Sequence, residues 1–217
     1  MGGRRLRDLR TMMERIKEKN NNSPEEYDRI YSARAITGPN WQDLRRWKRM
    51  LKYYRGGDLL DIGCLDSLVT IMASKMKNKG GIVGTDVAQE ALKSMNAMYK
   101  HIHYLEDDIM ESDMPENHFD YVCLGEVLEH LEDPLNAIKN AVKLTKPGGW
   151  IVISVPHNEA VELGAVDGDR HMWSFHAKGL TKIMNKYGHS HYKILGSKYF
   201  PKYKYCFPQL IIYCEKK

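Results

Sequence analysis

Apolar and polar positions follow two different patterns along the chain, and the change falls near residue 56. Before it, apolar side chains recur at helical spacing, which predicts amphipathic helices over residues 4–19, from Ser23 onward and over residues 41–54. The second begins with Ser-Pro-Glu-Glu, an N-cap residue followed by proline at the first helical position. We therefore expect a helical N-terminal extension over residues 1–55.

After residue 56, short apolar runs alternate with helical stretches. The runs are DLLDIG, GIVGTDV, HIHYLED, FDYVCLG and WIVISVP. Strands that alternate with helices at this spacing predict right-handed crossovers and a parallel sheet covered on both faces. Two later runs, YKILGSKYF and QLIIYCEK, predict an antiparallel hairpin at the sheet edge. Residues 56–217 are thus expected to form one α/β domain.

Composition narrows the picture only slightly. The 33 basic and 28 acidic side chains give a net charge of +5, so nucleic acid is a possible partner but not a favoured one. The four cysteines form no CxxC pair, which argues against a zinc site or a disulfide framework. No run approaches the roughly 20 apolar residues of a membrane span, and no apolar segment follows the basic N-terminus. We expect a cytoplasmic protein with no membrane contact.

Acidic residues and a glycine stand at the ends of three successive expected strands. Asp61, Gly63 and Cys64 follow the first strand, Asp86 ends the second and Asp108 follows the third. In open α/β sheets, ligands bind outside these strand ends. A carboxylate at the second position accepts hydrogen bonds from ribose hydroxyls, and one at the third can accept from an adenine amine. The three strand ends together predict a nucleoside-binding site.

These segments resemble the motif series of class I S-adenosylmethionine-dependent methyltransferases. The resemblance rests on DLLDIGC, GTDVA, EDDIMESDMPENHFDYV, GEVLEHLEDP and LTKPGGWIVISVP and covers roughly residues 40–215. It implies a Rossmann-like seven-stranded sheet with an antiparallel last strand, S-adenosylmethionine as cofactor and direct methyl transfer from the sulfonium carbon. It assigns the following positions to the cofactor: Asp61, Gly63, Cys64, Asp86, Val87, Asp108, Ile109, Gly125 and Glu126.

The sequence departs from the family pattern at Leu65 and Ser67, where glycines are usual. We expect these side chains to reshape the methionine end of the pocket without abolishing cofactor binding. The departure also leaves open a non-catalytic cofactor-binding or partner protein.

Candidate acceptor-activating residues fall in two segments. Glu126, Glu129 and His130 stand at i, i+3 and i+4, which places them near one face if the segment is helical. His157 and His171 belong to a loop that overhangs the acceptor pocket in this fold. One interpretation is a divalent ion such as Mg²⁺ held by Glu126, Glu129, His130 and His171. In the other, EVLEHLEDP is a helix start with solvated acids, and His130 or His157 acts as an ordinary base or merely packs. His171 is a further candidate catalytic residue.

The resemblance implies O-methylation of a small molecule such as a sugar, a glycan-linked group or a phenol. The ExxEH order is similar to metal-using methyltransferases of ubiquinone synthesis and of small-RNA 3′ ends, so metal-dependent RNA 2′-O-methylation is the alternative. The N-terminal helices would form a lid carrying Tyr27, Tyr31 and Trp41. We also expect His171 to line the pocket. The sequence decides neither the acceptor nor the oligomeric state.

Overall fold

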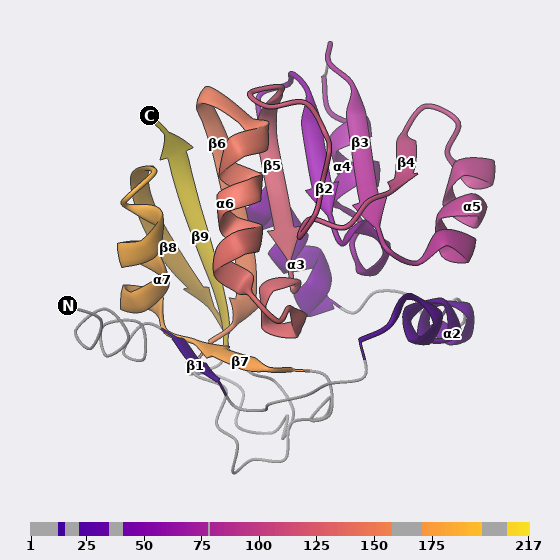
Figure 1. Ribbon diagram of the computed structural model, residues 1–217. Helices are drawn as coiled ribbons and strands as arrows, with labels where there is room; N and C mark the ends of the chain where they lie inside the picture. Colours follow the sequence, from indigo (N-terminus) through magenta and orange to yellow (C-terminus); the bar gives the residue numbers. More distant parts are fainter. Residues whose placement is uncertain (1–12, 16–21, 35–40, 78, 158–170, 197–207) are drawn as a thin grey trace.

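The computed structural model describes residues 13–15, 22–34, 41–77, 79–157, 171–196 and 208–217 (Figure 1). Its centre is a seven-stranded sheet in the order β4-β3-β2-β5-β6-β9-β8. The strands are β2 (Leu59–Ile62), β3 (Ile82–Asp86), β4 (His103–Glu106), β5 (Phe119–Gly125), β6 (Thr145–Pro156), β8 (Gly188–Leu195) and β9 (Gln209–Lys216). Strands β2 to β6 pair in parallel, whereas β9 runs antiparallel to both of its neighbours. The expected Rossmann-like sheet is confirmed.

The predicted antiparallel hairpin at the sheet edge is confirmed. Strands β8 and β9 are antiparallel, and β9 lies between β6 and β8, so β8 is the outermost strand. The burial pattern gives the reason, because residues 210–214 of β9 are buried whereas residues 191–194 of β8 are exposed. A continuous apolar run suits a strand covered on both faces, and a mixed run suits an edge.

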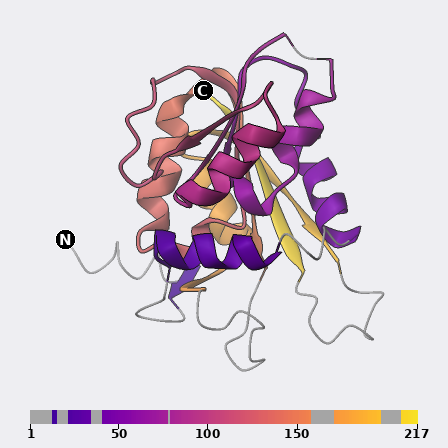
Figure 2. The same cartoon turned by 90° about the vertical axis from the view of Figure 1, so that its right-hand side faces the viewer.

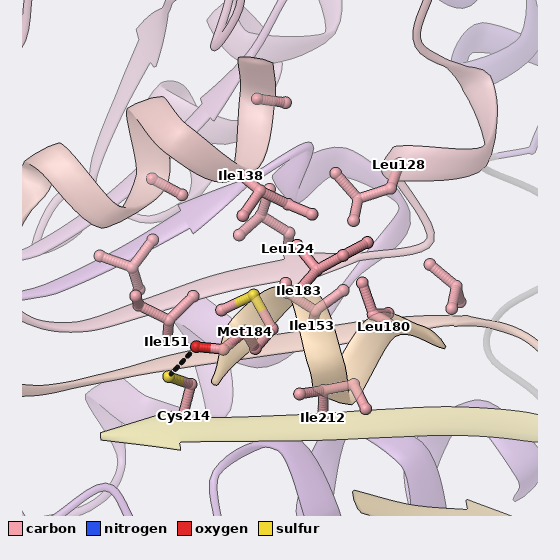
Figure 3. Close-up of a cluster of buried hydrophobic side chains, with 14 of the residues drawn as sticks. Leu124, Leu128, Ile138, Ile151, Ile153, Leu180, Ile183, Met184, Ile212 and Cys214 are labelled. Carbon is pink, nitrogen blue, oxygen red and sulfur yellow. Dashed lines mark hydrogen bonds between the residues drawn. The ribbon is translucent and has the colours of Figure 1, made fainter. Parts of the chain in front are cut away.

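Helices cover both faces of the sheet. One face carries α6 (Pro134–Leu144) and α7 (Ala177–Met184), and the other carries α3 (Trp41–Met50), α4 (Val69–Ser74) and α5 (Gln89–Met98). Figure 3 shows the first of the two cores, where Ile138 and Ile183 of the helices pack on Leu124 and Ile153 of the strands. These apolar layers fix the positions of the strand ends.

The expected N-terminal helix over residues 4–19 is wrong where the structure describes it. Residues Met13–Arg15 form a short strand, β1, which pairs antiparallel with β7 (Trp173–Phe175). The local spacing suited a helix, but the strand's partner lies in the C-terminal third of the chain, and Met13 is buried against the first core. The rest of the expected helix lies outside the described residues.

The other two N-terminal helices are present. α2 spans Pro24–Arg34, and α3 spans Trp41–Met50. Figure 1 shows α2 below β4 and α5, at the end of the sheet where the parallel strands finish, and Figure 2 shows it running across that end. Within the described ranges, no helix has the length and apolar character needed to cross a bilayer.

Candidate active site

A cavity of about 110 Å³ opens at the carboxyl ends of β2, β3 and β5 and is bordered by α2. Its lining includes seven of the residues predicted for the site: Gly63, Asp86, Val87, Asp108, Ile109, Glu126 and His130. They come from four separate segments of the sequence. The topology therefore brings the predicted strand ends to one place, as expected for a doubly wound sheet.

Gly63 makes the turn at the end of β2. Its φ of 68° lies in the left-handed region, and its N–H donates a 2.8 Å hydrogen bond to the carbonyl of Thr85. A Cβ added at this position would collide with Cγ2 of Val127, which also lines the cavity. Both the backbone conformation and the lack of space require glycine here.

Asp86 is buried at the end of β3, and the backbone of two loops fixes its carboxylate. Oδ2 accepts a 3.3 Å hydrogen bond from the N–H of Leu65, and Oδ1 accepts a 3.2 Å bond from the N–H of Ala88. Each carboxylate oxygen can accept more than one hydrogen bond. The acid can thus hold its position and still receive donors from the cavity.

Asp61 and its neighbours lie beneath the cavity rather than along it. The Asp61 side chain has no solvent exposure, and burial raises the pKa of its carboxyl to about 7. The Cys64 thiol is also fully buried, and burial raises its pKa well above the ordinary range. Neither Asp61 nor Cys64 belongs to the cavity lining, and the cofactor roles predicted for them stay predictions.

The two positions that depart from the family pattern also face away from the cavity. Leu65 is half-buried and packs against the second core, on the α3 side of the sheet. The Ser67 hydroxyl accepts a 2.9 Å bond from the N–H of Val69, which begins α4. Neither side chain belongs to the cavity lining. Where the family usually has glycines, Leu65 contributes packing and Ser67 contributes hydrogen bonds inside the protein.

Two adjacent acids follow β4, and the sequence singled out only the second. Asp108 is exposed and accepts a 2.9 Å bond from the N–H of Met110, whereas Asp107 is partly buried. The buried Oδ2 of Asp107 meets no hydrogen-bond donor within the described part of the chain, and burial raises the pKa of this carboxyl. Both acids line the cavity. Asp107 is therefore a candidate that only burial could reveal.

Glu126 follows β5 with a φ of 57°, an uncommon conformation for a residue other than glycine. Its carboxylate accepts bonds from the Ser154 hydroxyl at 3.0 Å and the Gln209 amide at 3.2 Å. The guanidinium of Arg46 in α3 lies 3.3 Å away, and the Arg46 residue is only 4% exposed. The sequence did not indicate this buried cation, because the LRRWKR segment around Arg46 has the pattern of a solvated helix face.

Three of the four predicted metal ligands come together. Ligand atoms of Glu129, His130 and His171 all lie within 4.8 Å of one another, and the two imidazole centroids are 4.7 Å apart. Glu126 is not in this group, because the contacts described above hold its carboxylate. The segment after β5 is a short 3₁₀ helix, η2 (Leu128–His130), so the i, i+4 geometry of an α-helix does not apply. One carboxylate and two imidazoles suit either proton transfer or a divalent ion.

His157, the third candidate base, lies apart from that cluster at the end of β6. Its backbone N–H donates a 2.7 Å hydrogen bond to the carbonyl of Pro208, and its backbone forms a β-bridge with Phe175 of β7. Burial, together with the charge of His176, lowers the pKa of its imidazole. The structure gives His157 neighbours other than His130 and His171.

Helix α2 supplies an aromatic wall to the cavity. Tyr27, Ile30 and Tyr31 line it, and the two tyrosine rings stack with centroids 6.0 Å apart. The Tyr27 ring also meets the His130 imidazole edge to face at 6.4 Å. The third expected lid aromatic, Trp41, begins α3, but its side chain lies outside what the structure describes.

Comparison with known proteins now identifies the class. A family described as "Methyltransferase domain" matches residues 40–192, and the chain belongs to this family. Its fold is that of the class I S-adenosylmethionine-dependent methyltransferases. A solved structure with the same fold is the N-methyltransferase NodS from Bradyrhizobium japonicum in complex with S-adenosyl-L-homocysteine. It has a TM-score of 0.69 and 19% identity, and the match covers 90% of this chain and 99% of NodS.

Two curated relatives have a higher sequence identity to this chain, over shorter matches. The ubiquinone biosynthesis O-methyltransferase of Nitrosospira multiformis is 29% identical over 137 residues, which is 57% of this chain and 54% of the relative. The demethylmenaquinone methyltransferase of Bacillus pumilus is 30% identical over 133 residues, or 58% and 56%. The chain thus spans about half the length of the curated relatives it matches.

Proposed function

We propose that this protein transfers the methyl group of S-adenosylmethionine to an oxygen of a small molecule. The observation that carries the proposal is the position of His130, which lines the cavity of the strand ends and also belongs to the cluster with Glu129 and His171. The cavity that would hold the cofactor is therefore next to a side chain that can accept a proton. The name of the ubiquinone biosynthesis O-methyltransferase supports an oxygen acceptor, and that of the demethylmenaquinone methyltransferase supports a small-molecule acceptor only.

The residues of the cavity fit the cofactor. Asp86 would accept from the ribose hydroxyls, since the backbone already fixes its carboxylate. Asp107 and Asp108 would supply acceptors for the adenine amine, and the buried Oδ2 of Asp107 is an acceptor in need of such a donor. Glu126 would face the ammonium group of the methionine part. When bound, the cofactor supplies an electrophilic methyl group on a sulfonium.

The work of the protein is then to position the acceptor and to remove its proton. His130 or His171 would accept the hydroxyl proton, with the buried Glu129 beside them. The stacked Tyr27 and Tyr31 would form a flat wall against the acceptor, which suits a phenolic ring. The same three ligands would also fit a divalent ion that polarises the acceptor oxygen, the metal-dependent form of this function.

The first test is calorimetric titration with S-adenosylhomocysteine. We expect the wild-type protein to bind and Asp86→Asn to bind about 10- to 100-fold more weakly, because hydrogen bonds to a charged group contribute about 1.5–3 kcal/mol. Glu106→Gln is the matched control, since Glu106 ends the neighbouring strand β4, is exposed and does not line the cavity. Absence of binding to the wild-type protein would refute the proposal.

The second test is transfer of labelled methyl to a catechol, a reducing sugar and a short RNA. Substitution by alanine of the histidine that acts as the base, His130 or His171, should lower turnover by about 100-fold or more. His171→Ala should leave S-adenosylhomocysteine affinity unchanged, because His171 is not part of the cavity lining. Methylation of the RNA alone would replace the small-molecule proposal with 2′-O-methylation.

A further inference from the structure

Helix α5 begins without a cap of its own. The residue before it is Ala88, whose side chain offers no acceptor to the first turn. The N–H groups of Glu90 and Ala91 instead donate to Oδ1 of Asp28, at 3.1 and 3.2 Å. Asp28 belongs to α2 and precedes Glu90 by 62 residues. The amino end of α5 is thus capped by the N-terminal extension.

The same turn of α5 is joined to the cofactor cavity. Ala88 donates its N–H to Asp86, the acid that lines the cavity at the end of β3. Asp28 and Asp86 therefore bind consecutive parts of one loop and helix start. A negative side chain at a helix amino end is also favoured by the helix dipole.

Helix α2 is tied down a second time, near its start. The side-chain amide of Asn22 donates a 2.8 Å bond to the carbonyl of His130 in η2. Between Asn22 and the end of α2 lie the residues that line the cavity, Tyr27, Ile30 and Tyr31. In Figure 2, α2 crosses the end of the sheet from one side to the other. The Asn22 bond holds α2 beside His130, on the proposed acceptor side of the cavity. The Asp28 bonds hold it beside Asp86, on the proposed ribose side.

We infer that Asp28 is a positioning residue that fastens α2 over the cofactor cavity, so that cofactor exchange requires Asp28 to leave the first turn of α5. When Asp28 leaves α5, Tyr27 moves away from the cavity with it, because the two residues are adjacent on α2. The inference rests on the proposed function for its kinetic consequence, but the fastening itself is a property of the ligand-free protein. The two can therefore be tested separately.

Hydrogen exchange of the ligand-free protein tests the fastening. Asp28→Ala should speed exchange at the Glu90 and Ala91 amides and also throughout residues 25–34 of α2. Asp28→Asn keeps an oxygen acceptor and should restore most of the protection, because Asn and Asp cap helices about equally well. Faster exchange confined to Glu90 and Ala91 would mean that Asp28 is only a cap, and would overturn the inference.

The dissociation rate of S-adenosylhomocysteine, measured by stopped flow, tests the consequence. Asp28→Ala should raise this rate about fivefold, the factor that corresponds to the loss of a typical cap. Asp28→Asn should stay within about twofold of the wild type. Glu25→Ala is the matched control, because Glu25 is an exposed acid in the first turn of the same helix with no bond to α5 among those observed. A wild-type rate in Asp28→Ala would overturn the inference.

Two outcomes distinguish the inference from the proposed function. If the wild type binds no S-adenosylhomocysteine, the proposed function fails, and the ligand-free exchange data alone decide whether α2 is fastened. If Asp28→Ala does not fold, hydrogen exchange of the wild-type protein with and without S-adenosylhomocysteine is the test. We then expect the ligand to slow exchange at Glu90, at Ala91 and along α2 together. Protection of Glu90 and Ala91 without α2 would count against the fastening.

Discussion

The hydroxyl of Ser67 donates a 2.9 Å hydrogen bond to Oδ2 of Asp61, a carboxyl group with no solvent exposure. The same hydroxyl oxygen accepts a bond from the N–H of Val69 at the start of α4. Ser67 therefore links the strand that carries the acid to the helix that follows. A buried polar group is stable only with such partners, so serine at this position has a structural purpose.

Restoring the family glycines should therefore weaken the fold rather than repair the site. In Leu65→Gly/Ser67→Gly we expect the free energy of unfolding to fall by about 1–3 kcal/mol or more, because a buried carboxyl loses its donor. Affinity for S-adenosylhomocysteine should change little, because neither side chain lines the cavity. Urea unfolding and calorimetry measure the two quantities. Ser74→Ala is the control, because it removes a hydroxyl that bonds to the carbonyl of Ile71 and to the imidazole of His101 and contacts no buried carboxyl.

The raised pKa of Asp61 predicts a pH-dependent loss of stability. Its carboxyl titrates near 7 in the folded protein and near its ordinary value of 3.8 in the unfolded chain. Between these values the folded state holds one more proton, so stability falls as the pH rises, by up to about 1.4 kcal/mol per pH unit. Below about 4 and above about 7 the contribution is constant.

Asp61→Asn removes this titration. We expect the free energy of unfolding of Asp61→Asn to rise relative to the wild type as the pH increases from 4 to 7, in urea titrations at successive pH values. Parallel curves for the two proteins would contradict the assignment of the titration to Asp61.

Two glycines with similar backbones allow the close approach at the site to be measured. Gly63 and Gly148 have φ values of 68° and 76°, but an added Cβ collides with Val127 at the first and meets nothing within 4 Å at the second. Gly148→Ala should cost about 1 kcal/mol from backbone strain alone. Gly63→Ala should cost distinctly more and should also abolish binding of S-adenosylhomocysteine. Equal unfolding free energies for the two variants would show that Val127 moves aside without penalty.

Chelation tests the two interpretations of the histidine cluster. We expect methyl transfer to survive EDTA, because Glu126, the fourth expected ligand, is held by Arg46 and by the bonds from Ser154 and Gln209. In that case His130→Ala or His171→Ala should shift the pH profile of turnover, as expected for loss of a base. Loss of activity in EDTA and its recovery with Mg²⁺, together with loss of cation binding in Glu129→Gln, would establish the metal interpretation instead.

The sequence by itself determined the elements of the sheet and the order of its motifs. Runs such as DLLDIG and FDYVCLG are bounded by turn residues, and their apolar character follows from burial on both faces, a property that local sequence records. Asp86 and Asp108 could be named because strand ends of a parallel sheet share one edge. Both acids line the same cavity, and their cofactor roles stay predictions.

Only the tertiary structure decided the features that depend on partners far apart in the chain. Met13 pairs with Phe175, Arg46 pairs with Glu126 and Asp28 caps α5, and no local pattern encodes such contacts. Tertiary burial also separated Asp107 from Asp108, which are equivalent as sequence letters. Hydrophobic periodicity reports which face of an element is covered, whereas the identity of the covering group is set by the packing of the whole chain.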